Sequence, residues 1–178
     1  YTRYEAVPRS EIGRKLVEGT NLIAHISVDS TYVLANGASV TELRYLSASG
    51  LAMAAFFFEI DLTSPDIALE VCTPQNKPIG VGFEPVTQQA MHVDAEGHRV
   101  LGGTNADFGS ETQKGPQGIF WKDGVAQKTV FNTTPARPRS FFAIRTDKRA
   151  VAAAAADYDE IAASKVIYEA VGGGPVLV

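Results

Sequence analysis

Tight-turn signals between short apolar runs constrain the fold of this chain more than any other feature of its sequence. Asn36-Gly37, Asp123-Gly124 and the polar segment 146–149 each lie between two such runs. Asn-Gly and Asp-Gly pairs favour two-residue turns, after which the next strand pairs antiparallel with the previous one. The sequence therefore predicts a sheet built largely from β-hairpins.

Two segments carry helix signals. Ser10 is a good cap for a short helix that runs through Val17. Asp157 and Glu160 have the spacing of a capping box and predict a helix that ends at Gly172. With the hairpins, these signals predict the α+β class: a predominantly antiparallel β-sheet with a few packed helices.

Alternating apolar residues predict further strands. In segment 54–61, Phe56, Phe58 and Ile60 share one face, which we expect to be buried. The pattern recurs at 67–71, and another strand is predicted from Val100 towards Asn105.

Length and composition indicate one ordinary globular domain covering residues 1–178. Apolar residues make up 45% of the chain and charged residues 20%, which is enough to build a core. The net charge of -4 argues against a nucleic-acid partner. The longest apolar run, 51–58, is far shorter than the roughly 20 residues that a membrane span needs. The apolar end at 175–178 predicts that this is the N-terminal portion of a longer domain.

The segment around Asn105 and Asp107 is the first candidate site. An amide and a carboxylate two positions apart at a strand end can together bind sugar hydroxyls, bind a divalent cation or serve in acid–base catalysis. The alternative is a turn in which both side chains bond to the local backbone. From the spacing alone, the turn is the favoured interpretation.

Glycines and arginines form the second candidate site. Gly172, Gly173 and Gly174 have backbone amides suited to holding a phosphate, or they simply end a helix and turn into a strand. Arg137 and Arg139 are the densest basic spot, able to clamp a phosphodiester or to be solvated. No GxGxxG or P-loop spacing follows a strand, so no nucleotide cofactor is expected, and no histidine or cysteine spacing predicts a zinc site.

Several of these blocks, in order and approximate spacing, resemble the phosphodiester glycosidase family, which includes the mannose 6-phosphate uncovering enzyme and bacterial secreted proteins. The blocks are Leu43-Arg44-Tyr45, Phe58-Glu59-Ile60-Asp61-Leu62, Asn105-Ala106-Asp107 and Gly172-Gly173-Gly174-Pro175. The chain departs from the family pattern at Gly109, where a second aromatic residue is usual.

The resemblance implies hydrolysis of a sugar 1-phosphodiester, derived from a glycan or the cell envelope, outside the cytoplasm. It implies that Asn105 and Asp107 orient the sugar or a cation, that the glycine amides hold the phosphate, and that residues beyond Val178 complete the site. The cofactor stays undetermined, a divalent cation being one alternative. A non-catalytic carbohydrate-binding or envelope-interaction domain on the same fold is the rival interpretation, and Gly109 favours it slightly.

Overall fold

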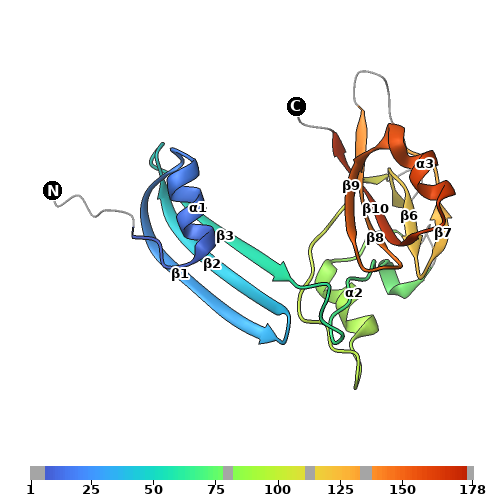
Figure 1. Cartoon of the computed structure of the whole chain (residues 1–178), viewed down its shortest axis with the longest axis horizontal. Helices are drawn as coiled ribbons and strands as arrows, with labels where there is room; N and C mark the ends of the chain where they lie inside the picture. Colours follow the sequence, from blue (N-terminus) through green and yellow to red (C-terminus); the bar gives the residue numbers. More distant parts are fainter. Residues whose placement is uncertain (1–6, 78–81, 111–114, 133–137, 176–178) are drawn as a thin grey trace. The chain divides into compact units, whose positions relative to one another are not determined.

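A computed structural model describes residues 7–77, 82–110, 115–132 and 138–175 (Figure 1). The chain divides into two compact units, Tyr1–Ile67 and Ala68–Val178, and each is described by itself. All strand pairings among the described residues are antiparallel, and short helices accompany the sheets. This confirms the predicted α+β class, while the expectation of a single domain stays a prediction.

The first unit is a three-stranded sheet with one helix. Its elements are α1 (Glu11–Gly19), β1 (Ile23–Ala35), β2 (Ala38–Ser47) and β3 (Ala52–Ile60), with the strands in the order β1-β2-β3. Ser10 caps α1 as predicted, because its Oγ accepts a hydrogen bond from the Gly13 amide at 2.9 Å. Gly37 has φ 89° in the β1–β2 turn, a conformation that favours glycine.

The two faces of this sheet differ sharply in exposure. Asp29, Thr41 and Leu43 share the face against α1 and are buried. The opposite face carries Phe56, which is 64% exposed, and Phe58, which is 38% exposed. The prediction that Phe56 and Phe58 are buried is therefore wrong: alternation showed that they share a face, but the described residues of this unit place α1 on the other one.

The second unit contains a five-stranded sheet, with the strands in the order β7-β6-β10-β8-β9. Its elements are η1 (Pro74–Asn76), α2 (Val86–Val93), β4 (Gly109–Ser110), β5 (Gly115–Pro116), β6 (Phe120–Lys122), β7 (Val125–Lys128), β8 (Arg139–Arg145), β9 (Ala150–Ala154), η2 (Ala155–Asp157), α3 (Tyr158–Ala163) and β10 (Ile167–Pro175). The short strands β4 and β5 pair separately. The hairpins predicted at Asp123-Gly124 and at 146–149 are confirmed as β6–β7 and β8–β9.

The core of this unit lies between its sheet and α3. Ile119, Phe141 and Ile167 come from the sheet side, and Tyr158 from the start of the helix. Tyr158 meets Phe141 edge to face, with ring centroids 5.7 Å apart, and its hydroxyl accepts a hydrogen bond from Trp121 Nε1 at 2.9 Å. The core thus anchors β6, β8 and β10 against one another, and these are the strands nearest to the candidate site.

Three local predictions were wrong. The helix predicted to end at Gly172 ends at Ala163; Lys165 then has φ 55°, and β10 begins at Ile167. Asp157 makes no side-chain cap, so the capping-box spacing was not used. Segments 67–71 and 100–105 contain no strand. They are held by side chains instead: the Val71 amide donates to Glu169 Oε2, and the Val100 amide donates to Asp94 Oδ1.

Candidate functional site

The centre of the candidate site is an ion pair between Asp107 and Arg139. Asp107 lies in the extended segment before β4, and Arg139 begins β8. Arg139 Nη2 contacts Asp107 Oδ1, and the two side chains are only 9% and 3% exposed. Burial of two charges is costly unless they are paired and hydrogen-bonded, so this pair holds the loop firmly against the strand.

The carboxylate of Asp107 is also held by backbone amides. Its Oδ1 accepts a hydrogen bond from the Phe108 amide at 2.7 Å, and its Oδ2 accepts one from Gly118. Both oxygens therefore have donors, and the carboxylate has a fixed orientation. The contact with the Phe108 amide agrees with the interpretation of this segment as a local turn. The ion pair with Arg139 is a long-range contact that the spacing did not indicate.

Arg139 is surrounded by groups from three segments. Its Nη1 donates to Gln117 Oε1 at 3.1 Å, and its guanidinium carbon lies 5.5 Å from the ring centroid of Phe108, a cation–π contact. Its Nε is buried, and no acceptor for it exists among the residues that the structure describes. A buried donor without an acceptor is unusual in a native structure.

Gly172 of β10 lies directly against Asp107. A Cβ on Gly172 would come within 2.6 Å of Asp107 Oδ2 and 2.7 Å of Gly118 Cα, so only glycine fits there. The Gly172 amide donates to the Ile119 carbonyl at 2.9 Å, and the Gly174 carbonyl accepts from Ser140 Oγ at 3.0 Å. These glycines are thus part of a strand, and the absence of a side chain at Gly172 lets Asp107 pack closely onto the sheet.

Other predicted site residues are placed differently. Asn105 is exposed on the segment that leads to Asp107. Gly173 lies beside Ser140, away from the carboxylate of Asp107. Arg137 lies outside the described residues. The structure therefore brings together Asp107, Arg139 and Gly172 from the predicted set.

Sequence reasoning missed three contributors to the site. Lys128 Nζ donates to the Pro116 and Gln117 carbonyls at 2.6 and 3.1 Å, and burial lowers its pKa, with the Arg139 charge adding to the effect and Asp107 opposing it. Lys128 is a single lysine at the end of β7, and no sequence pattern indicates that it contacts this segment. The contacts of Phe108 and Gln117 with Arg139 depend on which segments lie beside β8, and no local pattern indicates this.

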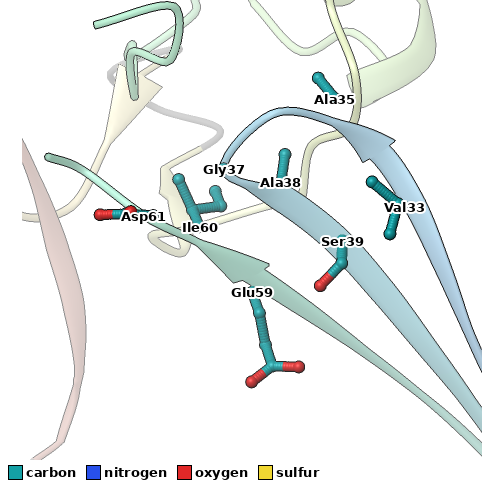
Figure 2. A pocket seen from close by; sticks show the side chains of 8 residues that line it. All are labelled: Val33, Ala35, Gly37, Ala38, Ser39, Glu59, Ile60 and Asp61. Carbon is teal, nitrogen blue, oxygen red and sulfur yellow. The ribbon is translucent and has the colours of Figure 1, made fainter. Parts of the chain in front are cut away.

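Glu59 and Asp61 are two acids at alternate positions of the predicted strand 54–61. Figure 2 shows them around a shallow hollow at the β1–β2 turn, with their carboxylates pointing in different directions. Asp61 lies just past the end of β3, and its Oδ1 accepts from the Thr63 amide at 2.9 Å and the Thr63 hydroxyl at 2.6 Å. The Asp61 carboxylate therefore organises a turn.

Among the described residues, no cluster of three or more His, Cys, Asp or Glu side chains is arranged to hold a metal ion. No helix in the same residues has the length and apolar character to cross a bilayer. In comparisons with known proteins, no family model matches the chain, and no curated protein matches it significantly.

Proposed function

We propose that this chain binds a sugar 1-phosphodiester at Arg139 and takes part in its hydrolysis. The observation that carries the proposal is the buried Arg139 Nε, a cationic donor that has no acceptor among the described residues. A guanidinium that is already held in place loses little entropy when it binds a phosphate oxygen. The resemblance of the Asn105 and Gly172 segments to the phosphodiester glycosidases supports the choice of ligand.

In this proposal each nearby side chain has a distinct role. Asp107 is a positioning residue, because its ion pair sets the direction of the Arg139 guanidinium. Phe108, which is 58% exposed, offers an aromatic face to the apolar side of a sugar ring. The exposed amide of Asn105 hydrogen-bonds to a sugar hydroxyl.

The chemistry proposed is addition of water across the bond between the anomeric carbon and the phosphate oxygen. The carbon–oxygen bond breaks, water supplies the new hydroxyl of the free sugar, and the phosphate leaves as a monoester. Negative charge grows on that leaving oxygen, and a fixed guanidinium stabilises it more in the transition state than in the ground state. We further propose an extracytoplasmic location, where glycan and envelope phosphodiesters occur.

A second candidate function is non-catalytic binding of the same class of ligand. It is favoured by the state of Asp107, whose two oxygens already accept hydrogen bonds from Phe108, Gly118 and Arg139. A carboxylate with all these donors is poorly placed to take or give a proton. On this alternative, Phe108 and Arg139 bind the ligand without cleaving it.

The test uses the methyl diester of N-acetylglucosamine 1-phosphate, with binding measured by calorimetry and cleavage by release of free sugar. Arg139→Lys should lower both affinity and cleavage, the latter by about 10²-fold, because an ammonium cannot reproduce the planar guanidinium contacts. Arg149→Lys, at a side chain that is 79% exposed, is the matched control and should change neither.

Three outcomes separate the alternatives. Cleavage that falls in Arg139→Lys but not in Arg149→Lys supports the hydrolase. Binding without cleavage in the full-length protein supports the non-catalytic candidate. Absence of both binding and cleavage in the folded parent chain overturns the proposal, and the fluorescence of Trp121 verifies that each variant is folded.

A further inference from the structure

The outer edge of β3 is a regular strand edge with unusual composition. β3 lies at one edge of the first unit's sheet (Figure 1), and its sequence Ala-Met-Ala-Ala-Phe-Phe-Phe-Glu-Ile carries one charge and no proline. Its pairing with β2 has no register shift: it begins where Ala38 faces Ile60 and ends where Leu46 faces Ala52. Such an edge is a template for pairing with another strand.

The opposite edge of the same sheet is protected. The pairing of β1 with β2 has register irregularities at three places, the first between Ile23 and His25 and the last between Val33 and Ala35. Bulges of this kind twist an edge and disrupt its row of backbone groups. The contrast between the two edges shows that only β3 keeps the geometry that a further strand requires.

Two hydrogen bonds fix which backbone groups of β3 point outward. Asp61 donates to the Gly37 carbonyl at 2.8 Å, and Ser47 donates to the Leu51 carbonyl at 2.8 Å. In an antiparallel pair, hydrogen-bonded and non-hydrogen-bonded positions alternate, so the odd-numbered residues 51–61 point their backbone groups towards β2. The even-numbered residues of β3 therefore direct their N–H and C=O groups away from the sheet. These residues are Ala52, Ala54, Phe56, Phe58 and Ile60.

We propose that β3 pairs antiparallel with β3 of a second copy of this chain about a twofold axis at Phe56. Phe56 then faces Phe56 of the partner subunit, and Ala54 faces Phe58 of the partner subunit. In this register each even-numbered residue faces an even-numbered residue of the partner subunit. The N–H and C=O groups of both residues point towards each other, so the two residues exchange two hydrogen bonds. The two three-stranded sheets become one six-stranded sheet.

Charge and side-chain chemistry agree with this register. Glu59, the only charged residue of β3, faces Met53 of the partner subunit, so the two carboxylates lie far from each other. Phe56 and Phe58 lie on the bare sheet face, 64% and 38% exposed. Across the axis, Phe56 faces Phe56 of the partner subunit, and Phe58 lies diagonal to that same ring. Cross-strand aromatic pairs stabilise sheets, and their burial removes apolar surface from water.

The occupant is a second copy and not an unrelated strand because the edge is self-complementary. An isologous interface needs a surface patch that matches itself under a twofold rotation. β3 meets this condition in backbone register, in charge and in the placement of small residues opposite Phe58.

The test is sedimentation of the full chain over a range of concentrations, comparing two charge variants of β3. Phe56→Lys places like charges directly opposite each other at the axis and should raise the dimer dissociation constant at least about tenfold. Met53→Lys, at a side chain that is 43% exposed, places its ammonium group opposite Glu59 of the partner subunit. It should leave the dissociation constant unchanged or lower it.

A crosslinking measurement covers the case in which a charge variant folds poorly. In a Cys72→Ser background, Phe56→Cys should form a disulfide-linked dimer on oxidation, since hydrogen-bonded partners have Cα atoms about 5.5 Å apart. Met53→Cys, whose partner is Glu59, should not. A chain that sediments as a monomer at every concentration, equal weakening by both lysine variants, or equal crosslinking of both cysteine variants overturns the proposal.

Discussion

Gly172→Ala is the substitution that most directly tests the packing of the candidate site. The added Cβ would lie 2.6 Å from Asp107 Oδ2 and 2.7 Å from Gly118 Cα, whereas ordinary contact begins near 3.4 Å. About 0.8 Å of movement is therefore needed on the carboxylate side. The Gly118 side is backbone, and it cannot yield by changing a rotamer. We expect the ion pair of Asp107 with Arg139 to be distorted.

The magnitude follows from two costs. Overpacking a well-packed site costs about 1–3 kcal/mol. Weakening one hydrogen bond of a buried carboxylate adds about 1 kcal/mol. We expect the free energy of unfolding of the second unit to fall by about 2–4 kcal/mol.

Urea denaturation followed by tryptophan fluorescence measures this change. Trp121 is the only tryptophan of the chain, and it lies in β6, beside the core of the second unit. The signal therefore reports on the unit that contains Gly172, whatever the stability of the first unit. With a slope of about 2 kcal/mol per molar urea, the midpoint should fall by about 1–2 M.

The neighbouring glycines are internal controls. A Cβ on Gly174 has its nearest neighbour, a Phe108 ring atom, at 3.8 Å, so Gly174→Ala should change stability by less than about 0.5 kcal/mol. A Cβ on Gly173 meets Ser140 Oγ at 2.6 Å, but this hydroxyl can rotate, so Gly173→Ala should be intermediate. A midpoint for Gly172→Ala equal to that of Gly174→Ala would refute the reasoning.

Three further predictions concern titration and hydrogen bonding. The hydrogen bond to Glu70 raises the pKa of His98 above its ordinary 6.5. The pairing therefore stabilises the fold below pH 6.5, and this stabilisation is lost as the pH rises through the raised pKa. An NMR titration of Glu70→Gln should give a lower His98 pKa. Burial raises the pKa of Glu169 above 4.5, so its contribution is present below pH 4.5 and lost as the pH rises through the folded value. Glu169→Gln should lose about 1–3 kcal/mol, because the amide group cannot accept from both backbone N–H donors, and it should lack this pH dependence in urea titrations. Tyr158→Phe removes the acceptor of Trp121 Nε1 and should lower stability by about 1 kcal/mol.

Each of these predictions has a result that contradicts it. An unchanged His98 pKa in Glu70→Gln would show that the ion pair does not form in solution. Parallel pH profiles for the parent and Glu169→Gln would show that Glu169 is not buried. Equal urea midpoints for the parent and Tyr158→Phe would show that the hydrogen bond between Trp121 and Tyr158 does not stabilise the core.

The sequence alone determined the hairpins, because turn chemistry is local. Asn36-Gly37 and Asp123-Gly124 bend the chain through conformations that their own residues favour, and the strands on either side pair as predicted. Ser10 caps its helix for the same reason. In each case the energetic cause lies within a few residues of the effect.

Tertiary structure decided the segments whose local signals conflicted. The capping-box spacing at Asp157 favoured a long helix, yet segment 167–175 became β10, because it pairs between β6 and β8 in the core of the second unit. Phe56 and Phe58 share a face as predicted, but burial depends on what covers that face, and α1 packs on the other one. Alternation reports which side chains share a face and nothing about the layer above it.

The sequence pointed to some residues of the candidate site but not to the geometry that joins them. Asp107 and Arg139 were each singled out from the sequence, yet their ion pair joins positions 32 residues apart, and no spacing rule links them. Gly172 meets Asp107 only because β10 runs beside β8 and leaves no room for a side chain next to this carboxylate. Local chemistry determined which residues were suited to a site, and the order of the strands determined which of them meet, because contact between distant segments depends on the packing of the whole sheet.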